Sequence, residues 1–298
     1  MRVLDGNATV YAEDSLGLDD ILPDVTVALC YGKLSHVREM RKLQMIQAAT
    51  AGVDSLPWED IPENVTVCGN PGSNADAVAE HAWSLILCQA HNLHIHLPNL
   101  RNHKFDMKPG IDILAGKTIG IIGMGSVGRR ISEIASALQM KTIAVTKSGK
   151  STGDYTFIGG PEDVDHVLEQ SDVVVLSTPL TKATRGMIDR RRLDLLKREC
   201  IFVNMGRAEL VKRDDLVDFL ERNPEFRVAT DVWWNAAEEF PKDAALMNYP
   251  NFIGTPYVAG GLGNSEIMRK MLTEAAMNVS RFLAGEKPRN IIDRGDYV

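Results

Sequence analysis

The sequence predicts an α/β protein built on a doubly wound parallel sheet, with a second, smaller α/β domain. Short β-branched runs alternate along the chain with helix-like stretches and with Gly and Pro, which is the pattern of βα units. The 298 residues are 44% hydrophobic and 24% charged, a globular composition at a length where a single core tends to divide. We therefore expect two domains.

The first seventy residues predict one small α/β layer. A strand-like VLDG follows Arg2. Three β-branched runs come after it, at residues 25–30, 45–50 and 65–70. From Asn74 to about His103, apolar residues recur at helical spacing with almost no punctuation, which predicts one long helix with a break at Pro98.

A second βα series predicts the larger domain. Its strands are expected at residues 117–122, 141–145, 172–176, 201–204, 227–230 and 251–254. Between the first two of these, residues 127–138 carry one apolar helical stripe, and a last helix is expected over 265–284, ending before Gly285. Six strands separated by helices indicate a doubly wound parallel sheet.

Charge and composition exclude two classes of partner. Thirty-three Lys and Arg against forty Asp and Glu give a net charge of −7, without a long basic run, so nucleic acid and anionic membranes are not expected partners. No apolar run approaches the ~20 residues of a membrane helix, and the chain opens without a signal segment, which predicts a cytoplasmic protein. The four cysteines lie far apart, so we expect buried thiols and no metal site.

A glycine-rich turn carries the sharpest chemical signal. It reads Gly123-Met124-Gly125-Ser126-Val127-Gly128, directly after an expected strand and at the start of an amphipathic helix. In this G-x-G-x-x-G pattern the glycines permit a tight turn and a close backbone approach, so that amides at the helix N-terminus hold a pyrophosphate. The context predicts a Rossmann-type dinucleotide site rather than a turn that only packs the helix.

The end of the second strand in this domain favours NADP, with NAD as the alternative cofactor. An NAD site places a carboxylate here to accept the ribose 2′-hydroxyl. This chain instead has Thr146, Lys147 and Ser148, followed by Lys150, which offer positive charge and a hydroxyl donor to a 2′-phosphate. The same residues also fit a solvated basic loop with no part in cofactor choice.

With these motifs in place, the chain resembles the D-2-hydroxyacid dehydrogenase family nearly end to end. The matching segments are Ala51-Gly52-Val53-Asp54, Asn70-Pro71-Gly72, Val78-Ala79-Glu80-His81, Thr178-Pro179-Leu180-Thr181, Thr184-Arg185-Gly186, Val203-Asn204-Met205-Gly206-Arg207 and Asp231-Val232. The resemblance implies a Rossmann-type domain beside a smaller flavodoxin-like domain, assembled as a homodimer.

The resemblance also implies roles for individual residues. Amides of Ala51, Gly52 and Val53 would hold a substrate carboxylate. Arg207 would bind a 2-oxoacid through carboxylate and carbonyl oxygens and stabilise charge as hydride arrives, and Asp231 would contact the nicotinamide carboxamide. Further cofactor contacts are expected from Gly123, Met124, Gly125, Ser126, Val127, Thr146, Lys147, Ser148, Thr178, Pro179, Thr184, Met205, Gly206 and Gly260.

Two positions depart from the family's pattern. The family's Thr-Pro-His stands here as Thr255-Pro256-Tyr257, so Tyr257 occupies the place of the proton-donating histidine. The glutamate that serves this histidine falls five residues after the strand-end aspartate, where this chain has Ala236, with Glu238 and Glu239 nearby. A phenol is neutral below its pKa of ~10, so Tyr257 is the candidate acid. The alternative is a packing residue in a disabled site.

The histidines are weaker candidates. Four of them cluster near the end of the long helix without a carboxylate or cysteine at ligand spacing, which indicates a solvated or subunit-facing surface: His91, His94, His96 and His103. His81 enters the candidate site as a possible substitute proton donor, although an ordinary hydrogen-bonded helix histidine is the simpler interpretation.

Together these observations predict a substrate domain, residues 1–92 with 263–298, and a dinucleotide-binding domain, residues 93–262. The predicted function is NADPH-dependent reduction of a small 2-oxoacid such as glyoxylate or hydroxypyruvate to its 2-hydroxyacid. The alternatives are an NADP(H)-binding module that has lost catalysis, and a reaction whose proton comes from water or from the substrate.

Overall fold

The computed structural model describes residues 9–11, 17–235, 237–261 and 263–298. The chain divides into two compact units, Met1–Asn74 with Gly263–Val298 and Ala75–Leu262. The expected boundary at residue 92 lies at the other end of helix α2 (Ala75–Ala90). This helix goes with the larger unit because its buried face, including Trp83 and Ile86, packs on that unit's helix and strands.

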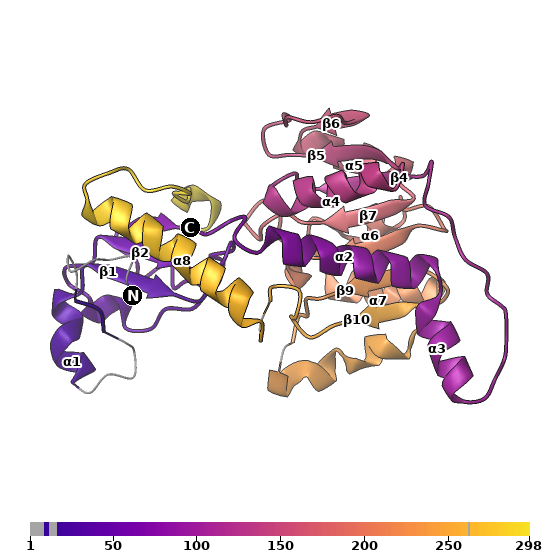
Figure 1. The fold of residues 1–298 in the computed structure, drawn as a ribbon, viewed down its shortest axis with the longest axis horizontal. Helices are drawn as coiled ribbons and strands as arrows, with labels where there is room; N and C mark the ends of the chain where they lie inside the picture. The colour runs from indigo at the N-terminus through magenta and orange to yellow at the C-terminus, as the bar shows by residue number, and fades with distance from the viewer. Residues whose placement is uncertain (1–8, 12–16, 236, 262) are drawn as a thin grey trace. The chain divides into compact units, whose positions relative to one another are not determined.

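The smaller unit contains a parallel sheet in the order β1 (Val27–Cys30), β2 (Met45–Ala48) and β3 (Thr66–Cys68). Every residue of β2 is buried, as expected for the central strand of a covered parallel sheet. Helix α8 (Ser265–Leu283) packs on β1 and β2 (Figure 1). The Trp58 ring stacks on the Tyr297 ring. The remaining helical turns are α1 (Leu18–Ile21), η2 (Leu22–Asp24), η3 (Val37–Glu39) and η8 (Arg294–Asp296). The strand expected at VLDG lies outside the described residues.

The larger unit contains a seven-stranded, all-parallel sheet in the order β10-β9-β8-β7-β4-β5-β6. Its strands are β4 (Thr118–Ile122), β5 (Lys141–Val145), β6 (Phe157–Gly159), β7 (Val173–Leu176), β8 (Ile201–Asn204), β9 (Arg227–Thr230) and β10 (Phe252–Gly254). The strand order reverses between β4 and β7, so the doubly wound topology predicted from the sequence is confirmed.

Helices cover both faces of this sheet (Figure 1). Helices α2 and α4 (Ser126–Ala137) bury their apolar sides on one face, while α5 (Val164–Gln170), α6 (Arg190–Leu193) and α7 (Arg213–Arg222) cover the other. The helix α3 (Leu93–Arg101) and the 3-10 turns complete the unit: η4 (Pro161–Asp163), η5 (Ala208–Leu210), η6 (Ala237–Lys242) and η7 (Ala244–Asn248).

Two local expectations were wrong. The single helix expected over 74–103 is two helices, because the left-handed backbone of Asn92 (φ 52°) ends α2, whereas Pro98 lies inside α3. The sheet also has a seventh strand, β6, which pairs with β5 at the sheet edge. It is only three residues long and follows a loop rich in Gly, Ser and Lys, so the sequence carries little strand signal there.

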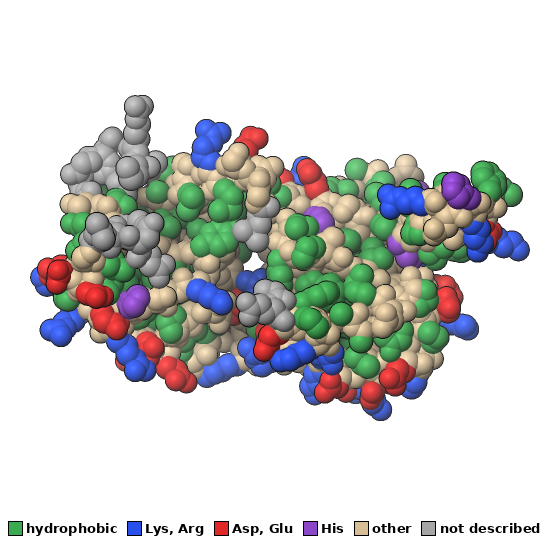
Figure 2. Space-filling model, turned by 90° about the horizontal axis from the view of Figure 1, so that it is seen from below, with side chains coloured by type: hydrophobic (Ala, Val, Ile, Leu, Met, Phe, Trp, Pro, Cys, Tyr) green, Lys and Arg blue, Asp and Glu red, His purple; other side chains and the backbone are tan. Residues whose placement is uncertain are grey.

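No helix in the described part of the chain is both long and apolar enough to cross a membrane. All four cysteines are free thiols. Cys30, Cys68 and Cys200 are buried as the sequence predicts, whereas Cys88 is only partly buried. In Figure 2 acidic and basic side chains are intermixed, mostly along the rim of the visible face, and hydrophobic side chains lie among uncharged ones toward its middle.

Candidate active site

Six chain segments that the sequence predicts to carry site residues meet at one edge of the larger sheet. Because its strands are all parallel, their C-terminal ends lie side by side, and open α/β sheets bind ligands at this edge. We call it the carboxyl edge and define it by the residues that directly follow β4, β5, β7, β8, β9 and β10: Gly123, Thr146, Ser177, Met205, Asp231 and Thr255.

At two positions in the turn after β4, close backbone contacts leave no room for a side chain, so only glycine fits. Gly123 adopts φ 106°, and a Cβ on it would lie 2.7 Å from the backbone nitrogen of Thr178. A Cβ on Gly128 would lie 2.2 Å from the carbonyl oxygen of Gly123. These contacts hold helix α4 and the β7 loop against the turn at the point where the strand order reverses.

Gly125 is different, because nothing inside the described protein requires a glycine there. Its backbone (φ −78°, ψ −157°) is open to other residues, and a Cβ would meet no atom within 4 Å. Gly125 is also the N-cap of α4 and supplies no side-chain cap to the amides of the first turn, which Ser126 and Val127 begin. This open cradle at a helix N-terminus fits a dinucleotide pyrophosphate. Met124 beside it is buried.

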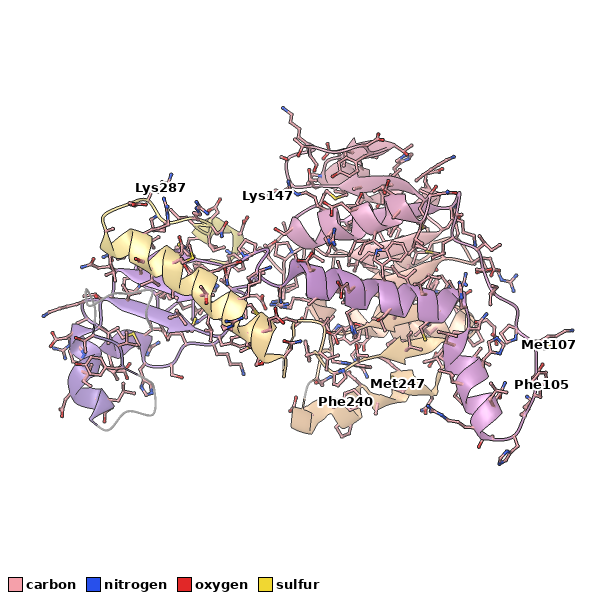
Figure 3. All side chains as sticks on the ribbon, viewed as in Figure 1. Phe105, Met107, Lys147, Phe240, Met247 and Lys287 are labelled. Atoms are coloured by element: carbon pink, nitrogen blue, oxygen red, sulfur yellow. The ribbon has the colours of Figure 1, made fainter. Side chains whose placement is uncertain are left out.

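The loop after β5 is a compact turn with a basic outer side. The Thr146 N–H donates to the Gly159 carbonyl at 3.0 Å, and the Thr146 hydroxyl accepts the Lys150 N–H at 3.0 Å. Lys147 and Ser148 are exposed at the top of the turn. Figure 3 shows Lys147 at the same edge of the sheet as the N-terminal end of α4.

The loop after β7 is stabilised by its own threonines. The Thr184 hydroxyl donates to the Pro179 carbonyl at 2.7 Å and accepts the Thr181 N–H at 2.8 Å. Thr178 presents its backbone to Gly123. Thr184 therefore shapes the loop, and Thr178 and Pro179 form the segment that faces the glycine turn.

A buried asparagine holds the turn that carries Arg207. Asn204, the last residue of β8, is 4% exposed; its amide donates to the Arg207 carbonyl at 2.8 Å and its oxygen accepts the Gly206 N–H at 3.1 Å. Met205 is buried, while Arg207 is partly exposed and donates to the Gly206 carbonyl at 3.0 Å. The sequence motif includes Asn204 without indicating this role, although a polar residue ending an apolar strand is a signal for it.

Asp231 is the most constrained charged group at the carboxyl edge. Its carboxylate, 6% exposed, accepts the N–H groups of Val258 and Ala259 at 2.9 Å each, and Gly260 follows directly. The Thr255 hydroxyl donates to it at 2.6 Å and lies 2.8 Å from Nε2 of His81. The sequence points to His81 but carries no signal for its partner Thr255, because the two residues lie 174 positions apart along the chain.

The Tyr257 hydroxyl is engaged by backbone. It donates to the Trp233 carbonyl at 2.7 Å and accepts the Trp233 N–H at 3.0 Å. Tyr257 also has φ 56°, in the left-handed region. Burial raises the pKa of the phenol, and the Trp233 hydrogen bond opposes that shift. The phenol is therefore neutral at ordinary pH, but it must leave the Trp233 carbonyl before it can donate a proton elsewhere.

The loop where the family's glutamate belongs is only partly described. Ala236 and the Glu238 side chain lie outside the described residues, and Glu239 is exposed and pairs with Lys242 at 3.1 Å. A different carboxylate holds the loop: Asp243, fully buried, accepts bonds from Arg213 at 2.8 Å and from the Asn235 N–H at 2.7 Å. Neighbouring Trp233 is buried in the core of the larger unit.

In the smaller unit, the expected substrate loop follows β2. Ala51 is exposed, Gly52 is half-buried and Val53 is buried, with the Val53 carbonyl accepting the Trp58 indole N–H at 2.9 Å. The Thr50 hydroxyl donates to the Gly52 carbonyl at 2.8 Å. These bonds fix the loop and leave Ala51 at the surface.

The histidines at the end of α2 and in α3 form no metal centre with the residues described. His94 lies 3.3 Å from the Asn251 side-chain oxygen, and no group of three or more His, Cys, Asp or Glu in the described residues is arranged to hold a metal ion.

Comparisons with known proteins agree with this geometry. Residues 83–259 match the sequence model described as the D-isomer specific 2-hydroxyacid dehydrogenase, NAD binding domain. D-3-phosphoglycerate dehydrogenase of Methanocaldococcus jannaschii is 30% identical over 86% of this chain, which spans only 49% of that protein's length. Glyoxylate reductase of Aeropyrum pernix is 29% identical over 85% of this chain and 77% of its own length. A crystal structure from Pyrobaculum aerophilum, provisionally assigned as a formate dehydrogenase, is 36% identical with a TM-score of 0.83, covering 92% of this chain and 90% of that one.

Proposed function

The chain belongs to the D-isomer specific 2-hydroxyacid dehydrogenase family, and from that premise we propose that it is an NADP-dependent reductase of a small 2-oxoacid. The observation that carries the proposal is the placement of Gly125, an unexplained glycine at an uncapped helix N-terminus, and Arg207 on one sheet edge. The first suits a dinucleotide pyrophosphate and the second a carboxylate with an adjacent carbonyl.

We propose that the cofactor site extends along the carboxyl edge from the α4 turn. Amides of the first turn of α4 would hold the pyrophosphate, and Lys147, Ser148 and Lys150 would meet a 2′-phosphate, which favours NADP over NAD. The segments after β7 and β8, with Asp231 and Gly260, would meet the nicotinamide end. NADPH supplies a hydride when bound.

We propose that Arg207 binds and polarises the substrate. Its planar guanidinium can pair with the carboxylate and carbonyl oxygens together, so that the negative charge arising on the carbonyl oxygen is stabilised. For the smaller unit, the backbone amides of Ala51, Gly52 and Val53 are proposed as donors to a carboxylate. The proton that completes the hydroxyl group comes from Tyr257 or from water, and substitution of Tyr257 distinguishes these sources.

The substrate class is proposed as glyoxylate or hydroxypyruvate and their 2-hydroxyacids. One reported relative is named glyoxylate reductase and another D-3-phosphoglycerate dehydrogenase, both names of enzymes for small hydroxy or oxo acids. The four free thiols suit a reducing compartment, which supports a cytoplasmic location.

We also propose a homodimer formed through the α3 arm, defined as residues 93–113. This segment exposes several large apolar side chains, among them Phe105 at 85% and Met107 at 80%. Figure 3 shows both on the extended stretch beyond α3. Several large apolar side chains exposed on one short segment are typical of an interaction site.

The test is NADPH oxidation with a panel of glyoxylate, hydroxypyruvate, pyruvate and bulkier 2-oxoacids, with NADH in parallel. We expect turnover with NADPH. Arg207→Lys should lower kcat/KM by about 10²–10³-fold, because lysine keeps the positive charge but lacks the planar guanidinium that donates two parallel hydrogen bonds. NADPH affinity should stay within about twofold, since the pyrophosphate amides are untouched. Arg222→Lys, an exposed arginine on α7 paired with Asp194, is the matched control.

Absence of turnover with every 2-oxoacid, combined with normal NADPH binding, would contradict the proposal. That result would instead support the binding module without catalysis. Turnover that is insensitive to Arg207→Lys would point to a substrate of another class.

A further inference from the structure

A line of three polar side chains connects helix α2 to the carboxyl edge of the larger unit. Nε2 of His81 lies 2.8 Å from the Thr255 hydroxyl, which lies 2.6 Å from Oδ1 of Asp231. Nε2 is also 3.8 Å from that same carboxylate oxygen. The residues come from α2, from the end of β10 and from the end of β9, so three separate elements supply the line.

The direction of each hydrogen bond follows from the chemistry of the groups. An ionised carboxylate only accepts, so the Thr255 hydroxyl gives its single hydrogen to Asp231. The Thr255 oxygen must then accept from His81, which requires a hydrogen on Nε2. A second proton on Nδ1 changes the charge of the ring and leaves this bond in place. His81 is thus held in one position in both charge states.

Because the Asp231 carboxylate is buried, a nearby cation would strongly change the electrostatic potential around it. Its side chain is 6% exposed, and the neutral donors of Thr255, Val258 and Ala259 satisfy it without supplying a full positive charge. Coulombic interaction between groups a few ångströms apart is strong when water is largely excluded. A protonated His81 would offset much of the field of Asp231, and a neutral His81 would not.

The place of Asp231 in the sheet connects this charge to the cofactor. The glycine turn follows β4, and β9 lies on the other side of the reversal in strand order. A dinucleotide held at that reversal would bring its nicotinamide half toward these strand ends. The nicotinamide ring carries a positive charge when oxidised and none when reduced, so an unopposed carboxylate near it favours the oxidised form.

We infer that His81 makes the relative affinity for NADP⁺ and NADPH depend on pH, through its link to Asp231. This inference rests on the proposed cofactor site. A second proton on the His81 ring would weaken the attraction of the carboxylate for the oxidised ring, while NADPH would lose no charge attraction. Low pH therefore favours binding of the reduced cofactor, the form that starts a reduction.

Other charged or titratable side chains lie on α2 and on the elements packed against it. They are Asp76 and Glu80 of α2, Arg129, Arg130 and Glu133 of α4, His94, His96 and Arg101 of α3, Arg207 after β8, Arg227 of β9 and Asp231 after it. The two histidines of α3 lie beyond the C-terminal end of α2. Arg130 pairs with Asp76 at 2.9 Å. Aspartate, glutamate and arginine keep their ordinary charges near neutral pH, whereas histidine changes charge between about pH 5 and 8.

The experiment measures Kd for NADP⁺ and NADPH by calorimetry from about pH 5.5 to about pH 8.5. We expect Kd(NADP⁺)/Kd(NADPH) to fall about fivefold across this range, the effect of one charge acting over several ångströms in a partly solvated site. The ratio cancels the titration of the 2′-phosphate, which both cofactors share. His81→Gln, whose amide can keep the bond to Thr255, should give a flat ratio at the high-pH value.

Controls separate the outcomes. His166→Gln, an exposed histidine on α5, should keep the native pH dependence. A flat ratio in the native protein, or a slope that persists in His81→Gln, would overturn the inference. If His81→Gln does not fold, His81→Asn serves, and the ratio in the native protein stands as an independent test. Failure of both cofactors to bind at every pH would instead reject the proposed function.

Discussion

Tyr257 adopts a backbone conformation that tyrosine rarely takes, and its neighbours enforce it. Its φ of 56° costs of order 1 kcal/mol and persists only where the surroundings over-determine it. Three bonds do so here: its N–H donates to the Asp231 carbonyl at 3.1 Å, and its hydroxyl exchanges two bonds with the backbone of Trp233. Through these bonds Tyr257, which follows β10, is held against the segment that follows β9.

We therefore expect Tyr257→Phe to be a stability variant. Loss of the hydroxyl leaves the Trp233 N–H and carbonyl unpaired, which costs about 1–3 kcal/mol, or roughly 2–4 °C in Tm per kcal/mol for a protein of this size. With water as the proton source, kcat should stay within about tenfold of the native value. Thermal unfolding and steady-state kinetics measure the two effects, with Tyr249→Phe as the control.

A loss of 10²-fold or more in kcat with an unchanged Tm would restore Tyr257 as the acid. The pH profile gives a second readout. Because burial raises the pKa of Tyr257 above its usual value near 10, a phenol that acts as acid keeps its proton through neutral pH. Its contribution to kcat would then disappear only as the pH rises through that raised pKa.

At the scale of elements, prediction succeeded where local pattern and tertiary packing agree. Helix α4 combines a glycine turn, an apolar stripe and a following strand, and it lies over Ser126–Ala137 as the pattern predicts. The predicted position of the helix break, Pro98, was wrong. The helix ends just before Asn92, which adopts the left-handed conformation, and an asparagine in the sequence does not by itself predict that conformation. Strand β6 was missed because it is stabilised by pairing with β5 rather than by local propensity.

The loop after β5 gives the prediction that belongs to this scale. Thr146 closes the loop by accepting the Lys150 N–H, and the basic side chains of Lys147 and Lys150 remain exposed. We expect Lys147→Ala with Lys150→Ala to raise Kd for NADPH by about tenfold, because about 1.4 kcal/mol of charge attraction to the 2′-phosphate is lost. Kd for NADH should change by less than about twofold, since NADH lacks that group.

Lys141→Ala is the control for this loop, because Lys141 is an exposed lysine at the opposite end of the same strand. Equal affinities for NADPH and NADH in the native protein would contradict the NADP proposal. An equal loss of both affinities in the double variant would indicate damage to the turn, and circular dichroism would detect it.

At the scale of the whole molecule, the sequence indicates which residues reach the carboxyl edge and says little about their bonds. The site residues that follow strands of the larger sheet, such as Gly123, Thr146 and Asp231, could be placed from the sequence because parallel strands bring their C-terminal ends to one edge. The hydrogen bonds of His81, Thr255 and Asp231 depend on how α2 packs against β9, a tertiary relation with no local signal. The hydrogen bond from the Asn204 amide to the Arg207 carbonyl joins residues only three positions apart, so the local sequence could have predicted it.

The exposed apolar side chains of the α3 arm bear on how the chain assembles. The α3 arm follows Asn92, and near its end the Asp112 N–H donates to the Ala90 carbonyl at 2.7 Å. Between these points it exposes Phe105, Met107 and Ile111, which a monomer would leave in water. Burying an exposed large apolar side chain contributes about 1.5–3 kcal/mol, so a few such residues from each of two chains can stabilise a dimer.

We expect light scattering coupled to size exclusion to report twice the mass of the chain. Phe105→Asp with Met107→Asp should shift the molecule to the monomer mass, because each buried carboxylate would cost several kcal/mol in an apolar interface. Met277→Asp, an equally drastic change at an exposed methionine of α8, should leave the mass unchanged. A monomeric native protein at micromolar concentration, or a dimer that survives the arm substitutions, would show that this apolar surface has another purpose.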